Sequence, residues 1–164
     1  MNQNELTRLT LKLKDKNLKI AFAESITGGM LVSEFIKAKG TSDILLGSIV
    51  TYAEEVKQKV LGVKKQTLKL YTAESQQVTN EMVMGLHKLL KADVCVAVTG
   101  LCGTGASESS EKPIGSVFFS ILFLQKVEEF REVFDGDSTA IRKKAADYIF
   151  QKIEDTLDRH YAHS

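Results

Sequence analysis

The sequence contains no tryptophan, one proline and only two cysteines, and each scarcity excludes a class of protein. Cys95 and Cys102 are too few for a disulfide scaffold or for a zinc site built from four cysteines. Apolar runs are also short: one of the longest, Val117–Leu124, is interrupted by Ser120 and cannot span a bilayer. The amino terminus lacks the basic and apolar stretches of a secretory signal. We therefore expect a reduced cytoplasmic protein.

An excess of charge of either sign is missing as well. The chain has 22 Lys and Arg against 21 Asp and Glu, a net charge of +1, so we expect neither nucleic acid nor membrane as a partner. What is present is a globular composition, since 43% apolar residues exclude a disordered chain. The length of 164 residues suits one domain, predicted over residues 1–164 with a disordered tail at 159–164.

Hydrophobic periodicity alternates between strand and helix patterns along the chain. Helices are predicted near Leu6–Leu13, Leu31–Ile36 (ending near Gly40), Glu54–Leu61 and Ile141–Leu157. A further helix is predicted to begin after an N-cap at Ser75 and to carry Val78, Met82, Leu86 and Leu89 on one face. Strands are predicted at Leu18–Ala23, Ile44–Tyr52 and Val94–Val98, and as a hairpin of Ile114–Phe123 with Val127–Phe134. This alternation predicts an α/β sandwich with a mainly parallel sheet, in which the hairpin makes one strand antiparallel.

Two glycine-containing turns follow predicted strands, at Ser25–Gly29 and at Thr99–Gly105. Ligands of parallel sheets bind beyond the carboxyl ends of the strands. Glycines let a backbone approach a ligand, and free N–H groups attract phosphate or carboxylate, with Lys112 as an added charge. Purely structural interpretations stand beside these: a capped strand-to-helix turn and a flexible surface loop. The glycine order of the second turn is not a dinucleotide fingerprint.

Ser42 is one candidate nucleophile, because Tyr52 and Lys57 follow it at the other end of a predicted strand. A serine needs a group that takes its proton, and a lysine can do so when burial lowers its pKa. Sequence spacing does not show that these three residues meet. The structural alternative makes Ser42 a cap and Lys57 a solvated helix residue.

Cys102 is the second candidate, since loop N–H groups could lower the pKa of its thiol. A cysteine hydrolase also needs a histidine, and none of His87, His160 and His163 has a persuasive position. We expect Cys102 to be unreactive and Cys95 to lie in the core. No cluster of side chains has the spacing of metal ligands, so no metal is predicted.

Several motifs, taken in order, resemble the CinA C-terminal domain, the competence/damage-inducible or nicotinamide-nucleotide amidohydrolase family. They are Ala23–Gly29, Thr51–Lys57 with Leu61–Val63, Thr99–Gly103, Lys112–Gly115, Glu81-Met82 and Gly136-Asp137. The resemblance covers about Leu6 to Leu157. It implies a three-layer α/β/α sandwich with a five-stranded mixed sheet. It also implies hydrolysis of nicotinamide mononucleotide to nicotinic acid mononucleotide and ammonia, in pyridine-nucleotide salvage, without metal or cofactor.

The resemblance assigns roles by position, with a serine–lysine arrangement as the catalytic group. Ser42 would be the nucleophile, Lys57 the base and Tyr52 a helper in proton transfer. Substrate-binding positions would be Ser25, Thr27, Gly28, Gly29, Thr99, Gly100, Gly103, Lys112 and Arg142. The sole partner expected is a small nucleotide substrate, and a homo-oligomer is left open.

The chain departs from the family pattern at four places. These are Ile26, Glu74-Ser75-Gln76, the loop Gly100–Ala106 and Ser138. The departures keep two alternatives open beside the mononucleotide amidohydrolase. One is an amidase for another small carboxamide, and the other is a nucleotide-binding or regulatory domain with weak catalysis.

Overall fold

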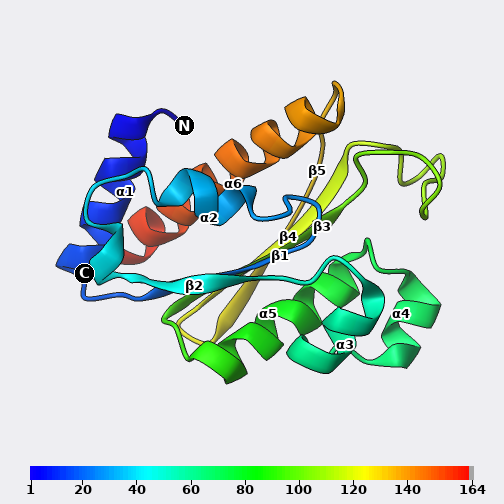
Figure 1. The fold of residues 1–164 in the computed structure, drawn as a ribbon. Helices are drawn as coiled ribbons and strands as arrows, with labels where there is room; N and C mark the ends of the chain where they lie inside the picture. Colours follow the sequence, from blue (N-terminus) through cyan, green and yellow to red (C-terminus); the bar gives the residue numbers. More distant parts are fainter. Residues whose placement is uncertain (163–164) are drawn as a thin grey trace.

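The computed structural model describes residues 1–162 as a three-layer α/β/α sandwich, which confirms the predicted fold class (Figure 1). The helices are α1 (Gln3–Asp15), α2 (Met30–Phe35), the 3-10 turn η1 (Thr41–Asp43), α3 (Glu54–Leu61), α4 (Lys65–Tyr71), α5 (Gln76–Leu90) and α6 (Ser138–Tyr161). The strands are β1 (Ile20–Glu24), β2 (Leu45–Val50), β3 (Val94–Gly100), β4 (Ser116–Phe123) and β5 (Lys126–Val133).

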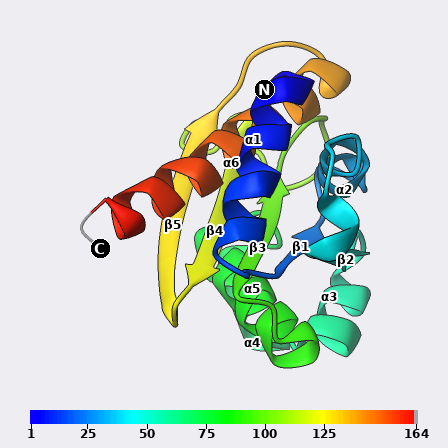
Figure 2. The ribbon, with the colours of Figure 1, turned by 90° about the vertical axis from the view of Figure 1, so that its left-hand side faces the viewer.

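The five strands form one mixed sheet in the order β2-β1-β3-β4-β5, seen from β5 on the left to β2 on the right in Figure 2. Strand β1 is parallel to both β2 and β3, and β4 is antiparallel to β3 and β5. Four strands therefore point the same way and only β4 opposes them, as the hairpin predicted. The carboxyl ends of β1, β2 and β3 consequently lie at one edge of the sheet.

Alternate residues of the central strands pack on opposite layers. Phe22 lies in the cluster beneath α1, α2 and α6, where its ring meets that of Phe35 edge-on at 5.4 Å between centroids. Ala21 and Ala23 belong to the other cluster, beneath α3 and α5, where Met82 is buried. Figure 1 shows these two groups of helices on opposite faces of the sheet. Small residues on the second face let α5 approach the strands closely.

Local signals set the helix boundaries. The Ser75 hydroxyl accepts a hydrogen bond from the N–H of Val78, so the predicted N-cap of α5 is confirmed. The carboxylate of Asp137 caps α6 in the same way, and Gly62 ends α3 with a φ of +70°. No helix within residues 1–162 combines the length and apolarity that crossing a membrane requires.

Some boundaries differ from those predicted. Helix α2 ends at Phe35 rather than near Gly40, and Leu89 is exposed rather than on the buried face of α5. Helices η1 and α4 had no clear sequence signal. Helix α6 continues to Tyr161, so residues 159–161 are helical rather than part of a disordered tail. His163 and Ser164 lie outside the described residues.

Candidate active site

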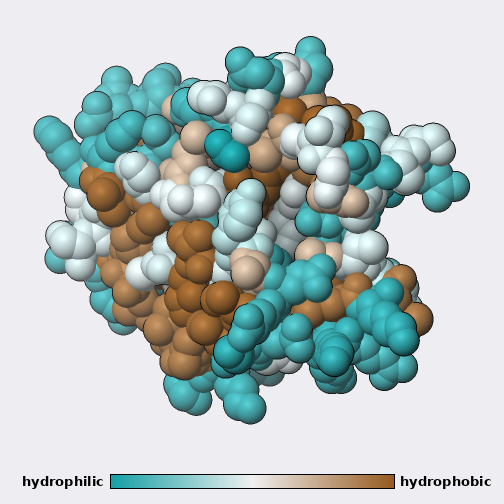
Figure 3. Space-filling model, turned by 45° about the vertical axis from the view of Figure 1, so that its right-hand side comes forward, coloured by the Kyte–Doolittle hydropathy of each residue, from teal (hydrophilic) through white to brown (hydrophobic). Residues whose placement is uncertain are grey.

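A cavity of about 420 Å³ opens at the carboxyl ends of β1 and β3. Figure 3, which brings this side of the molecule forward, shows an indentation between the upper and lower parts of the surface. The lining residues come from both glycine-containing turns, from the segments before α3 and α5, and from the start of α6. They are Ser25, Ile26, Tyr52, Glu74, Gly100, Leu101, Cys102, Gly103, Thr104, Ala106, Ser138 and Arg142.

A serine–lysine contact lies at this cavity, and its serine is Ser25. The side chain of Lys57 is buried, although it belongs to the short surface helix α3. Its Nζ donates to Ser25 Oγ at 3.0 Å and to the carbonyl oxygens of Thr51 and Tyr52 at 2.6 and 3.0 Å. Burial lowers the pKa of Lys57 from its ordinary value, and the nearby carboxylates of Glu74 and Glu54 oppose that shift.

These three contacts suit an amine that takes up a proton. A neutral lysine has two N–H bonds, which match the two carbonyl oxygens of Thr51 and Tyr52. Its lone pair is then left for the third neighbour, the hydroxyl of Ser25. Lys57 can thus remove the proton of Ser25 and make its oxygen a nucleophile.

The structure does not bring Ser42 to Lys57. Ser42 is exposed in η1, before the first residue of β2, whereas Lys57 contacts the carbonyl of Thr51, after the last residue of β2. A six-residue strand is roughly 20 Å long, so the two side chains lie at opposite edges of the sheet. The expected Ser42–Lys57 pair is therefore wrong, and Ser25 takes the place beside the lysine.

Tyr52 lines the cavity, but its contact with Lys57 is made by the backbone carbonyl rather than by the phenol. Tyr52 is 72% exposed. It can therefore face a bound ligand. The predicted help in proton transfer stays a hypothesis about the phenol.

Glu24, directly before Ser25, fixes the first turn from beneath. Its fully buried carboxylate accepts hydrogen bonds from two hydroxyls and three backbone N–H groups. The donors are Thr27 Oγ1 (2.7 Å), Ser48 Oγ (2.7 Å) and the N–H groups of Gly29 (3.2 Å), Leu31 (2.8 Å) and Val32 (3.2 Å). The anion expected at these N–H groups is thus the chain's own carboxylate, and the three N–H groups are not free to bind a ligand phosphate.

Other N–H groups of the same turn remain available. Those of Ile26 and Thr27 donate to no acceptor within residues 1–162. Both residues directly follow Ser25. Their N–H groups can therefore bind the negative oxygen of a tetrahedral intermediate formed on Ser25 Oγ. Gly28 and Gly29 turn the chain with φ of +55° and +103°, and the Thr27 side chain is buried against Glu24. Thr27, Gly28 and Gly29 therefore shape the turn and do not line the cavity.

Gly100 lets the two turns pack closely. A Cβ at this position would lie 2.7 Å from the carbonyl oxygen of Ser116 and 2.8 Å from Cδ1 of Ile26. The neighbouring Thr99 is buried, with its hydroxyl 2.8 Å from that of Thr79, so it braces α5 rather than facing a ligand. Gly103 lines the cavity, but a Cβ added at this position would have no neighbouring atom within 4 Å, so close packing does not require a glycine there.

The second loop, between β3 and β4, also has N–H groups that bind a carboxylate of the chain itself. The N–H groups of Gly105 and Ala106 donate to the carboxylate of Glu108 at 2.7 and 2.9 Å, and the Gly105 contact holds the pKa of Glu108 below its ordinary value. Lys112 donates to Thr72 Oγ1 and to the carbonyl oxygen of Glu74 at 2.7 and 2.9 Å. Lys112 therefore fastens the loop to the segment before α5, and it does not line the cavity.

Arg142 is the only cationic side chain among the lining residues of the described chain. Its Nε donates to the carbonyl oxygen of Ile26 at 3.0 Å and its Nη2 to Cys102 Sγ at 3.5 Å. Ser138, one helical turn earlier on α6, also donates to Cys102 Sγ, at 3.4 Å. A guanidinium has five N–H donors, so Arg142 retains donors for a ligand anion.

The thiol of Cys102 has no histidine to activate it among residues 1–162. His87 contacts Ala92 and Cys95, and His160 packs against the ring of Phe123. Burial raises the pKa of Cys95 to about 12, as a core thiol requires. No group of three or more His, Cys, Asp and Glu side chains in the same described range is arranged to hold a metal ion.

Sequence reasoning missed three features of the site. Ser25 was assigned to binding, although its place after the first strand and before the glycines suited a nucleophile. Glu74 and Ser138 were noted only as departures from the family pattern. Long-range packing brings them to the cavity, and no local pattern reveals it.

Three comparisons with known proteins agree with one another. The sequence model of the CinA C-terminal domain matches residues 3–157. A CinA-like protein of Thermotoga neapolitana is 42% identical over 147 residues, and one of Petrotoga mobilis is 36% identical over 157 residues. These matches cover 89% and 96% of this chain but only 36% and 38% of the relatives. The chain thus spans little more than a third of the length of these curated relatives.

Solved structures of matching size share the fold. The competence damage-inducible protein A of Klebsiella pneumoniae superposes with a TM-score of 0.91 at 31% identity, covering 98% of this chain and 99% of that one. A CinA superfamily protein from Escherichia coli superposes with a TM-score of 0.87 at 30% identity, covering 92% of this chain and 87% of that one.

Proposed function

Because this chain belongs to the CinA C-terminal domain family, we propose that it is an amidohydrolase whose nucleophile is Ser25 and whose base is Lys57. The substrate proposed is nicotinamide mononucleotide, hydrolysed to nicotinic acid mononucleotide and ammonia in cytoplasmic pyridine-nucleotide salvage. The observation that carries the proposal is the 3.0 Å contact between Lys57 Nζ and Ser25 Oγ at a cavity. The reaction needs no metal or cofactor.

The proposed chemistry proceeds through a covalent ester. Lys57 takes the proton of Ser25 as Oγ attacks the carboxamide carbon, and the N–H groups of Ile26 and Thr27 receive the negative oxygen. The C–N bond then breaks, and Lys57 returns the proton to the departing ammonia. Lys57 then takes a proton from water as the water oxygen attacks the ester, and it returns this proton to Ser25 Oγ as the ester C–O bond breaks and the acid is released.

The phosphate of the substrate is assigned to Arg142 and the Ser138 hydroxyl. The alternative N–H groups are already bonded to Glu24 and Glu108. Arg142 and Ser138 line the same cavity from α6, and Arg142 carries the positive charge that a phosphate requires.

Ammonia release from a set of carboxamides tests the proposal. We expect release from nicotinamide mononucleotide, less from the riboside, which lacks phosphate, and least from a small aliphatic amide. Faster release from another carboxamide would favour the general amidase. Binding of the mononucleotide without ammonia from any compound would favour the regulatory domain.

A further inference from the structure

The cavity has an acidic end as well as a basic one. Glu74 is the only carboxylate among its lining residues in the described chain, as Arg142 is the only cation. The two side chains come from opposite layers of the sandwich, since Glu74 precedes α5 and Arg142 lies on α6 (Figure 1). A ligand that fills this cavity therefore meets opposite charges at its two ends.

The acidic end lies near the serine–lysine pair. The charge of Glu74 acts on Lys57, where it opposes the effect of burial on the lysine pKa. The exposed ring of Tyr52 lines the same cavity. The cavity that contains Ser25 is thus also lined by a carboxylate and an aromatic ring.

Contacts with the second loop hold the Glu74 carboxylate in place. Ser107 Oγ donates to Glu74 Oε2 at 2.5 Å, and Lys112 Nζ donates to the carbonyl oxygen of Glu74. Oε1 accepts no hydrogen bond from residues 1–162, so it is available to a ligand. The charge of Glu74 acts on two cations, Lys57 and Lys112, but the Nζ of each donates to oxygens outside this carboxylate, and neither lysine lines the cavity.

A cationic aromatic ring in the cavity would bring a positive charge to the free Oε1 of Glu74. A pyridinium substituted at its ring nitrogen carries a permanent positive charge beside its carboxamide. It is attracted both to a carboxylate and to the face of a tyrosine ring. An uncharged carboxamide of the same shape gains neither interaction.

We propose that Glu74 and Tyr52 make this cavity selective for carboxamides borne on a cationic ring, and that the preferred ligand is a zwitterion with an anionic group at Arg142. The inference rests on the proposed function, because the carboxamide is placed at Ser25. It adds a specificity determinant, Glu74, that lies outside the reacting pair.

Comparing the oxidised and the reduced nicotinamide ring isolates the effect of the positive charge on binding. Nicotinamide mononucleotide and its 1,4-dihydro form share the ribose, phosphate and carboxamide, but only the oxidised form has a cationic ring. Calorimetric titration at pH 8 in a Ser25→Ala background measures the binding of both without turnover. We expect the oxidised form to bind at least about tenfold more tightly, and Glu74→Gln to reduce that ratio to about two by weakening only the oxidised form.

Two further variants in that background separate charge from loop structure. Glu54→Gln removes a charge that also acts on Lys57 but does not line the cavity, and Ser107→Ala removes the hydroxyl that holds Glu74. Both should keep a ratio of at least about fivefold. An unchanged ratio in Glu74→Gln, or an equal loss in Glu54→Gln, would overturn the inference.

The outcome is separable from that of the proposed function. Ammonia release is measured on the chain that retains Ser25, whereas the binding ratio is measured without it. If Glu74→Gln lowers the ratio of the two affinities and no ammonia is released, the charge selectivity is supported and the proposed amidohydrolase activity is wrong. If ammonia is released and Glu74→Gln leaves that ratio unchanged, only the proposed selectivity is wrong.

Discussion

The amine of Lys57 lies 3.0 Å from the hydroxyl oxygen of Ser25, although 32 residues separate the two in the chain. Sheet topology explains the contact. Ser25 follows β1, the Thr51–Lys57 segment follows β2, and the two strands are parallel neighbours whose ends lie side by side. The contact thus depends on the β1–β2 pairing as much as on either residue.

Replacing Lys57 by Met should reduce kcat by at least about a hundredfold, because Ser25 loses its proton acceptor. Methionine keeps the apolar stem without the amine, which protects the packing of α3. The rate of ammonia release by purified variant and parent measures the effect. A variant that keeps most of the parent rate would show that Lys57 is not the base.

The pH dependence of kcat/KM should reflect the ionisation of Lys57. Burial lowers its pKa, so the neutral, active amine becomes populated at a lower pH than an ordinary lysine allows. We expect kcat/KM to rise with pH and to level off below the pH range of a solvated lysine. A rise that continues to the ordinary lysine pKa would contradict the assignment.

Glu24→Gln should disturb both the site and its stability. Glutamine offers one oxygen to donors that now share two, and it leaves its NH2 facing N–H groups. We expect a loss of about 2–4 kcal/mol in the free energy of unfolding, measured in urea, and a lower kcat. Ser48→Ala removes one donor only, so its loss should be less than half as large. Equal losses would show that the carboxylate does not organise the turn.

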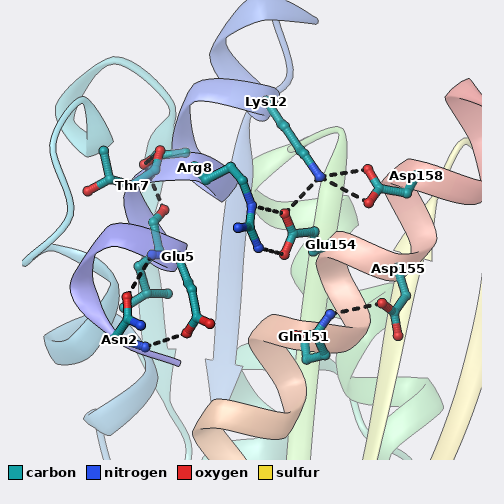
Figure 4. A network of polar contacts seen from close by, with 11 residues as sticks. Asn2, Glu5, Thr7, Arg8, Lys12, Gln151, Glu154, Asp155 and Asp158 are labelled. Atoms are coloured by element: carbon teal, nitrogen blue, oxygen red, sulfur yellow. Dashed lines mark hydrogen bonds and ion pairs between the residues drawn. The ribbon is translucent and has the colours of Figure 1, made fainter.

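Helices α1 and α6 are joined by a buried acid, Glu154, which should make the stability depend on pH (Figure 4). The hydrogen-bonded Arg8 guanidinium, together with Lys12, lowers the pKa of Glu154 to about 2. The pKa is depressed in the folded state, so the stabilisation is complete above the unfolded value near 4.3 and is lost as pH falls toward 2. The loss should be on the order of 2–3 kcal/mol.

Urea unfolding of Glu154→Gln from pH 7 to pH 3 checks this expectation. The variant should be less stable than the parent at pH 7, and the difference should shrink at pH 3. The matched control is Glu128→Gln, which breaks an exposed pair with Arg159 and should change the free energy of unfolding by less than about 1 kcal/mol. A constant difference across this pH range would exclude the carboxylate as its source.

Cys102→Ala should keep ammonia release within about threefold of the parent. The thiol only accepts weak hydrogen bonds from Ser138 and Arg142, and Arg142 keeps its bond to the Ile26 carbonyl. Loss of activity in this variant together with full activity in Ser25→Ala would instead indicate a cysteine amidase.

Most of the fold was predictable because its signals are local. The apolar run around Phe22, the Ser75 cap and the β4–β5 hairpin each define their element within a few residues. The site was less predictable, because contacts such as Glu74 with Ser107 join segments that no periodicity relates. The role of Ser42 came from a positional match, and a match along the chain does not report which edge of the sheet a residue occupies.

The two glycine turns show a second limit of sequence reasoning. Their composition correctly indicated anion-binding N–H groups, but the anions are carboxylates of the chain itself, Glu24 and Glu108. A sequence records that such N–H groups exist. It does not record which acceptor reaches them first.

The most direct test of the central claim compares Ser25→Ala with Ser42→Ala in ammonia release from nicotinamide mononucleotide. Both variants remove one hydroxyl, and circular dichroism verifies that both are folded. We predict that Ser25→Ala loses at least about a thousandfold in kcat, because the nucleophile is gone, whereas Ser42→Ala retains the parent rate. Full activity in Ser25→Ala with loss of activity in Ser42→Ala would contradict the account and would indicate Ser42, at the opposite edge of the sheet, as the nucleophile.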